Sequence, residues 1–266
     1  MSSFFGQSNT KIHYRLIGKG ECIVLIHGYL ETLEIWNDFA EELSKSYRVL
    51  TFDMPGHGMS DELSECNSVE GMATIANEIL MHLEISKAVI VGHSMGGYIA
   101  LAFAELFPSS TAGLCLFHST PFADGEQKKS NRMNEIELIL KGEKKLIVED
   151  ALPLRFANMN LMKFRSEVNR AKAIALDISD GGVVATLKAM VSRPDRNHVF
   201  QKANFPTMMI FGMRDNHISL DVASDLANRH KNTRTVYLNN SGHMGFIEEK
   251  GQALVAIKSF LECVFS

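Results

Sequence analysis

The 266-residue chain has no apolar run that approaches the roughly 20 residues needed to span a bilayer. Its beginning (1–15) also lacks a basic stretch followed by an apolar one, so we expect no signal peptide. The formal net charge is only −4, which gives no electrostatic reason to expect nucleic acid or an anionic membrane as a partner. These absences favour a soluble, cytoplasmic protein and leave its oligomeric state open.

Cysteine is scarce, and its four copies are scattered without a Cys-x-x-Cys pair or a spacing typical of zinc ligands. Cys22 and Cys115 lie in apolar, strand-like runs, where a buried free thiol is the ordinary interpretation. The histidines show no His-x-x-x-His spacing either. We therefore expect no metal and no other cofactor, and a reducing cytoplasmic environment.

Short strand-like runs alternate with helical patterns, which predicts a mostly parallel sheet with helices on both faces. The run 22–27 (CIVLIH) is apolar without alternation, as expected of a strand buried on both faces. The other expected strands are 12–17 (an edge or second strand), 47–53, 87–92, 112–118, 206–212 and 234–238. The expected helices between and after them are 31–46, 68–85, 95–107, 219–230 and 249–263.

The segment 121–203 breaks this alternation. It carries helical patterns at 134–141, 144–156, 162–176 and 183–191, has no convincing strand and is too long for an ordinary loop. We therefore expect an α/β core over 1–120 and 204–266, with an all-helical cap over 121–203 inserted into it.

The strongest local signal is Gly92-His93-Ser94-Met95-Gly96, which lies between an expected buried strand and an expected helix. A tight turn there would project the Ser94 hydroxyl out of the sheet, and Gly92 and Gly96 would let strand and helix backbones approach closely. A serine hydroxyl becomes a good nucleophile only beside a base. The alternative is a glycine-rich turn with an incidental serine.

Two further residues could complete such a site. Asp215 and His243 each follow an expected strand, at the edge where open α/β sheets bind their ligands. His243 would accept the proton of Ser94, and Asp215 would orient the imidazole. Asp124 and Asp221 are the alternative candidates for the acid.

Backbone N–H groups could stabilise the negative charge that forms during an attack by Ser94. Met95 begins the expected helix, so its N–H would point at a developing oxyanion. Tyr29 follows the strand 22–27, and its N–H would be the second donor. For the His27-Gly28-Tyr29 stretch taken alone, an ordinary strand-to-helix loop is an equally good interpretation.

The stretches HGYL, DMPGHGMSD, GHSMGG, GMRD and SGHMGF resemble the motifs of the α/β-hydrolase superfamily, and the resemblance covers essentially the whole chain. It implies an eight-stranded, mostly parallel sheet with the insertion acting as a lid. It also implies a catalytic triad of Ser94, Asp215 and His243, in the chain order of that fold.

The main functional hypothesis is hydrolysis of a small carboxylic ester, lactone or thioester through an acyl-enzyme on Ser94, with a small molecule as substrate. Serine at this position argues against the dehalogenases and epoxide hydrolases of the superfamily, which carry aspartate there. The alternatives are a cofactor-free lyase or carbon–carbon bond hydrolase on the same triad, and a non-catalytic small-molecule receptor.

The substrate itself cannot be identified from the sequence. Several apolar residues of the expected cap could face the pocket and favour an apolar acyl or alkyl group, although most are expected to pack inside the cap. They are Met133, Leu138, Leu140, Leu152, Phe156, Met159, Met162, Phe164 and Met190. His93 is expected to point away from the site. His118 is expected to be a packed histidine, with a place in the wall of the pocket as the alternative.

Overall fold

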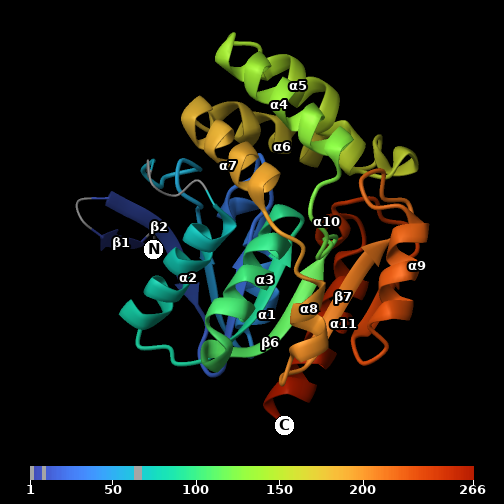
Figure 1. Cartoon of the computed structure of the whole chain (residues 1–266). Helices are drawn as coiled ribbons and strands as arrows, with labels where there is room; N and C mark the ends of the chain where they lie inside the picture. The colour runs from blue at the N-terminus through green and yellow to red at the C-terminus, as the bar shows by residue number, and fades with distance from the viewer. Residues whose placement is uncertain (1–2, 8–9, 63–67) are drawn as a thin grey trace.

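The computed structural model describes residues 3–7, 10–62 and 68–266, so Cys66 lies outside the described residues (Figure 1). Its centre is an eight-stranded sheet with the order β1-β2-β4-β3-β5-β6-β7-β8. β2 is antiparallel to both of its neighbours, and the pairs from β4 to β8 are parallel. The strands are β1 (Ser3–Gln7), β2 (Thr10–Ile17), β3 (Cys22–Ile26), β4 (Arg48–Phe52), β5 (Ala88–His93), β6 (Thr111–Phe117), β7 (Thr207–Gly212) and β8 (Arg234–Leu238).

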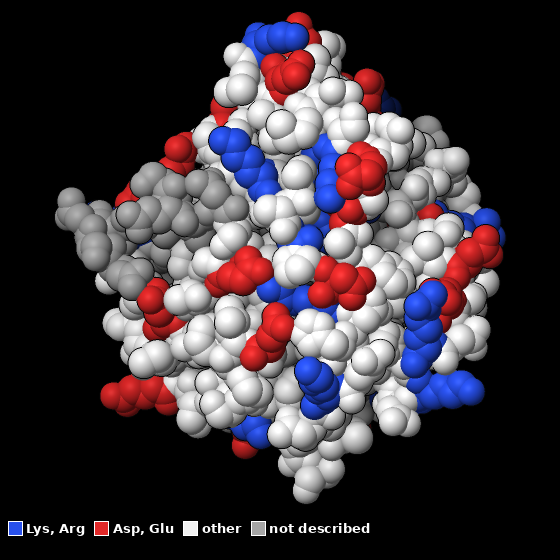
Figure 2. All heavy atoms as spheres, viewed as in Figure 1, with Lys and Arg blue, Asp and Glu red and all other residues white. Residues whose placement is uncertain are grey.

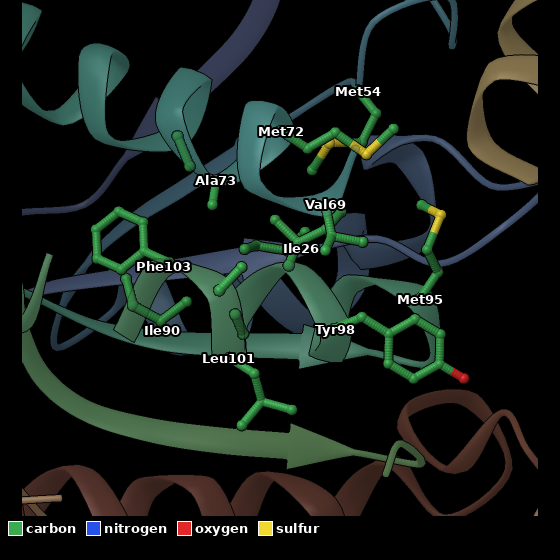
Figure 3. Packing of buried hydrophobic residues seen from close by; sticks show 14 of the residues in the cluster. Ile26, Met54, Val69, Met72, Ala73, Ile90, Met95, Tyr98, Leu101 and Phe103 are labelled. Carbon is green, nitrogen blue, oxygen red and sulfur yellow. The ribbon is translucent and has the colours of Figure 1, made fainter. Parts of the chain in front are cut away.

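Helices cover both faces of the sheet, as the sequence predicted. α2 (Val69–His82) and α3 (Met95–Leu106) pack on one face, where Val24 and Ile26 of β3 belong to their apolar cluster (Figure 3). α1 (Asn37–Ser44) and α11 (Lys250–Phe265) pack on the other face, together with Ile23 and Leu25. Alternate residues of β3 therefore lie in opposite layers, which explains why this strand is apolar throughout.

Between β6 and β7 the described chain forms only helices. They are α4 (Glu126–Leu140), α5 (Lys144–Ala151), α6 (Arg165–Asp177), α7 (Asp180–Ser192) and α8 (Asn197–Lys202), with the 3-10 turns η3 (Pro153–Arg155) and η4 (Asn158–Asn160). α4 to α7 form a layer beyond one end of the sheet, at the top of Figure 1. α8 lies instead against the core, because Arg196 just before it pairs with Glu70 of α2 and Glu105 of α3.

Several boundaries differ from those predicted. The helix expected at 31–46 is divided into η1 (Leu33–Trp36) and α1, and α4 begins at Glu126 rather than at residue 134. The strand β1 and the short helices α8 and α10 (Gly245–Glu248) were not predicted. The first turns of α4 are polar and exposed, so they carry no apolar periodicity that would reveal a helix.

The surface has no strongly charged face in the view of Figure 2. Acidic and basic side chains alternate over the described part of this face, without an extended area of one sign. Among the described residues, no helix has both the length and the apolar character that crossing a bilayer requires.

Candidate active site

Ser94 lies in a strained turn at the carboxyl end of β5. Its φ and ψ are 51° and −115°, a conformation that a non-glycine residue adopts only when the surroundings enforce it. The Ser94 N–H donates to the carbonyl oxygen of Phe117 on β6 at 3.0 Å, which fixes the turn against the sheet. The side chain does not cap α3. Its hydroxyl is therefore not used for structure at the start of the helix.

Two glycines allow this turn. A Cβ atom on Gly92 would collide with the backbone carbonyl of Gly96, and a Cβ atom on Gly96 would collide with the carbonyl oxygen of Ile26. Neither neighbour can move aside, because both are backbone atoms of the packed core. Strand and helix thus approach one another as closely as the sequence motif predicted.

Asp215 and His243 form a direct hydrogen-bonded pair in the loops after β7 and β8. The distance between His243 Nδ1 and Asp215 Oδ2 is 2.7 Å. The other carboxylate oxygen, Oδ1, accepts the backbone N–H groups of His217 at 2.7 Å and Ile218 at 3.2 Å. Asp215 is thus fixed by its own loop while it holds the imidazole.

The protonation states of this pair suit a base and its orienting acid. Burial lowers the pKa of His243 to about 3, so its imidazole is neutral near neutral pH. Burial opposes the charge on Asp215, but attraction to His243 and hydrogen bonds from His118 and His243 outweigh it and hold the Asp215 pKa well below its usual value. The arrangement is therefore a carboxylate beside a neutral imidazole that can accept a proton.

Burial of histidines also predicts how stability changes with pH. Burial lowers the pKa of both His57 and His243 from 6.5 to about 3. Between these values the unfolded chain binds a proton at each of these two histidines and the folded chain does not, so the free energy of unfolding decreases as the pH falls below about 6.5. Each site contributes at most about 1.4 kcal/mol per pH unit. Urea unfolding between about pH 7 and pH 4.5 should show this decrease, and equal stability across that range would contradict it.

His118 contacts the same carboxylate from the end of β6. It is fully buried with a φ of 48°, and its Nδ1 lies 3.5 Å from Asp215 Oδ2. The backbone N–H groups of Gly212 and Gly245 approach its two ring nitrogens at 3.0 and 3.2 Å. His118 is therefore packed, as expected, but it is packed against the acid of the site.

His118, Asp215 and His243 are close enough together that a metal site has to be considered. The possible ligand atoms of His118, Asp215 and His243 lie within 4.8 Å of one another. However, the short hydrogen bond between His243 and Asp215 occupies one ligand atom of each, and backbone N–H groups approach both nitrogens of His118. These contacts favour a hydrogen-bonded cluster of the three side chains over a metal centre.

The alternative acids lie in other surroundings. Asp124 binds Arg132 and Arg193 beside α4, and Asp221 is exposed in the first turn of α9 (Leu220–Arg229). Within the described residues, neither of them has a hydrogen bond to His243.

Of the two expected oxyanion donors, Met95 follows Ser94 directly, and Tyr29 lines the same cavity as Ser94. Met95 is the first residue of α3, and Tyr29 lies in the loop after β3. Glu31 folds this loop, because its Oε2 accepts the N–H of Gly28 at 2.6 Å. The Tyr29 carbonyl accepts a hydrogen bond from Arg155 at 2.6 Å, so Glu31 and Arg155 both fix the conformation of the loop.

Glu31 and Arg155 form a buried ion pair that was not predicted. Glu31 is 2% exposed, and its Oε1 lies 2.9 Å from Arg155 Nη1. Burial opposes ionisation of Glu31, but the attraction of His93 and Arg155 lowers its pKa to about 2. No sequence signal joins these residues, because one is in the loop after β3 and the other is in η3.

The same network reaches His243. The Arg155 carbonyl accepts the N–H of His243 at 2.6 Å, and His93 joins Glu31 (2.9 Å) to the carbonyl of His243 (2.9 Å). His93 thus lies behind the imidazole rather than in the cavity. The network connects the loop of Tyr29, the loop of His243 and the helical segment.

Ser94 and His243 line a common cavity of about 430 Å³, which the helical segment also lines. Of the nine apolar residues considered for this role, only Met190 belongs to the lining. Leu140 and Met162 are exposed, whereas Leu152 and Phe156 are buried in packing. Charged side chains of α4 and its flanking residues occupy much of the wall instead.

Comparisons with known proteins agree with this fold. The sequence profile of a family described as "alpha/beta hydrolase fold" matches residues 21–250. The pimeloyl-[acyl-carrier protein] methyl ester esterase of Aliivibrio fischeri is 25% identical over 95% of this chain and 98% of its own. The (E)-2-((N-methylformamido)methylene)succinate hydrolase of Acinetobacter baylyi is 24% identical over 96% and 95%, respectively.

Solved structures share the fold over nearly the full length. A thermophilic esterase from Thermogutta terrifontis has a TM-score of 0.94 at 24% identity, with all of both chains covered. The enol-lactonase from Burkholderia xenovorans LB400 has a TM-score of 0.89 at 20% identity and covers 98% of this chain and 100% of its own. With the family profile spanning most of its length, the chain belongs to the alpha/beta hydrolase fold family.

Proposed function

We propose that the protein is a serine hydrolase that cleaves a small carboxylic ester, lactone or thioester through an acyl-enzyme on Ser94. The observation that carries this proposal is the site itself. A strained serine and a neutral histidine line one cavity, and a buried carboxylate holds the histidine at 2.7 Å. The similar proteins include a methyl ester esterase and an enol-lactonase, which supports the same reaction class.

In the proposed mechanism, Ser94 Oγ attacks the carbonyl carbon while His243 accepts its proton. The N–H groups of Tyr29 and Met95 stabilise the resulting oxyanion. His243 then gives the proton to the leaving oxygen or sulfur, and a water molecule hydrolyses the acyl-enzyme with His243 as base. Asp215 keeps the imidazole in the required tautomer. The helical segment 121–203 acts as a cap that limits access of water.

The experiment that tests this proposal labels the protein with a fluorophosphonate and measures hydrolysis of p-nitrophenyl esters from acetate to decanoate. We expect a single adduct on Ser94, no adduct in Ser94→Ala, and turnover with an optimum of chain length. Labelling without ester turnover would direct the search to lyase or carbon–carbon bond hydrolase chemistry. Absence of both labelling and turnover would overturn the proposal and favour a receptor.

His118 is a positioning residue in this scheme. Replacing His118 with alanine should lower kcat by about 10- to 100-fold with a small change in KM, because Asp215 would lose a neighbour that fixes its carboxylate. His230→Ala is a matched control, since it removes a buried histidine at the far end of α9. Equal kcat values for His118→Ala and the wild type would contradict this role.

A further inference from the structure

The cavity that holds the proposed nucleophile has an unusual set of charges on its cap side. Three basic side chains, Lys128, Arg132 and Arg193, line it together with two acidic ones, Asp124 and Glu135. Lys128 and Arg132 lie on α4, and Arg193 follows the end of α7. This part of the wall therefore carries one surplus positive charge when all five groups are ionised.

Asp124 is the counter-ion for all three cations. Its buried carboxylate accepts Arg193 Nη2 on Oδ1 at 2.8 Å and Arg132 Nε on Oδ2 at 2.6 Å, and Lys128 Nζ lies 3.9 Å from Oδ1. One carboxylate cannot balance three positive charges. Lys128 is half exposed, but Arg132 and Arg193 are largely buried and share this one carboxylate, so a second anion in the cavity would stabilise them.

The two arginines keep donors that protein groups do not use. Arg193 is 5% exposed, and its Nε has no hydrogen-bond partner among the described residues. Arg132 donates to Asp124 from its Nε only. Its terminal nitrogens form no hydrogen bond within the described part of the chain. A guanidinium group has five N–H donors in a planar fork that fits the two oxygens of a carboxylate.

Nearby titratable groups indicate that the potential here is positive. Burial raises the pKa of Glu135, which weakens this residue as a counter-ion. Burial alone would raise the pKa of Tyr98 as well, yet the attraction of Arg193 and the two other cations lowers it. The Tyr98 ring lies 3.7 Å beneath the Arg193 guanidinium, and its hydroxyl points away from the apolar core (Figure 3).

Arg155, the remaining cation of the cavity, does not contribute to this surplus of positive charge. Arg155 is already balanced by Glu31 at 2.9 Å and donates to the Tyr29 carbonyl. Its charge is therefore used to hold the loops of the site. The surplus belongs to the three basic residues around Asp124.

We propose that Lys128, Arg132 and Arg193 form a subsite for a carboxylate of the substrate, so that the enzyme prefers esters whose acid part carries a second, free carboxylate. The unused guanidinium donors of Arg132 and Arg193 fit the two oxygens of a carboxylate. This inference rests on the proposed esterase function, since it names the substrate class for hydrolysis at Ser94. Charge-assisted hydrogen bonds from a buried arginine give the selectivity.

The test compares monoethyl esters of succinate, glutarate, adipate and pimelate with the corresponding diethyl esters. We expect kcat/KM to be about tenfold or more higher for at least one monoester than for its diester, as one charge-assisted hydrogen bond would give. The preferred chain length would report the span from Ser94 to the subsite. Equal kcat/KM for every monoester and its diester would overturn the inference and leave the esterase function standing.

A substitution at Arg132 tests whether this residue gives the preference for monoesters. Arg132→Gln should lower the ratio of kcat/KM for the preferred monoester to kcat/KM for its diester by about tenfold or more. Lys129→Gln is the matched control on the same helix, because Lys129 pairs with Glu126 and does not line the cavity. An equal loss for both ester types in Arg132→Gln would overturn the subsite.

A binding measurement separates failure of the subsite from failure of the catalytic proposal. Binding of free glutarate and of inorganic phosphate to Ser94→Ala is followed by calorimetry, and it does not depend on turnover. Glutarate binding that is lost in the Ser94→Ala/Arg132→Gln double variant would support the subsite even if no ester were hydrolysed. Absence of glutarate binding, or tighter binding of phosphate, would overturn it.

Discussion

Replacing Ser94 with alanine is expected to lower kcat for ester hydrolysis by about 10³- to 10⁶-fold. The loss is large because no other hydroxyl occupies the strained turn between β5 and α3, and the residual rate comes only from oxyanion stabilisation and binding. Alanine should leave the fold intact, since the Ser94 side chain does not cap the helix.

The measurement is steady-state hydrolysis of the best p-nitrophenyl ester, with circular dichroism to verify folding. Ser110→Ala is the matched control, because this serine lies in the 3-10 turn between α3 and β6 and does not line the cavity. Turnover by Ser94→Ala within about tenfold of the wild type would refute an acyl-enzyme on this residue.

Replacing Glu31 with glutamine is expected to destabilise the fold by about 3 to 5 kcal/mol. The substitution removes the only carboxylate that pairs with the buried Arg155 among the described residues, and it leaves the guanidinium charge uncompensated. It also weakens the contacts of Glu31 with Gly28 and His93. Urea unfolding monitored by the fluorescence of Trp36 would measure the change in the free energy of unfolding.

The matched control is Glu34→Gln, which removes an exposed pair with Arg170 and should cost about 1 kcal/mol or less. The double variant Glu31→Gln/Arg155→Met should be more stable than Glu31→Gln alone, because it removes the uncompensated charge as well. A Glu31→Gln variant as stable as Glu34→Gln would show that the buried pair does not support the fold.

The sequence predicted the fold well because its strands and core helices carry their own local signals. The run 22–27 is apolar on both faces and became β3, and the glycines around Ser94 match the close backbone approach at Gly92 and Gly96. The α/β fold and the eight-stranded sheet are confirmed. The triad and oxyanion donors remain a proposal, with a geometry that suits their roles.

What the sequence could not predict depends on contacts between distant segments. Glu31 and Arg155 are 124 positions apart, and neither stands in a motif. The charged wall of the cavity was missed for a similar reason, because Lys128 and Arg132 lie on polar turns of α4 that resemble a solvated surface. Helical periodicity identified apolar residues of the segment 121–203, but it could not tell which side of each helix faces the cavity.

The position of Arg155 has a consequence for the two loops that it connects. Its side chain donates hydrogen bonds to Glu31 and to the Tyr29 carbonyl, and its own carbonyl accepts the His243 N–H. Arg155 thus ties the helical segment between β6 and β7 to the loops of Tyr29 and His243, so a change at this one position would disturb three parts of the cavity wall together.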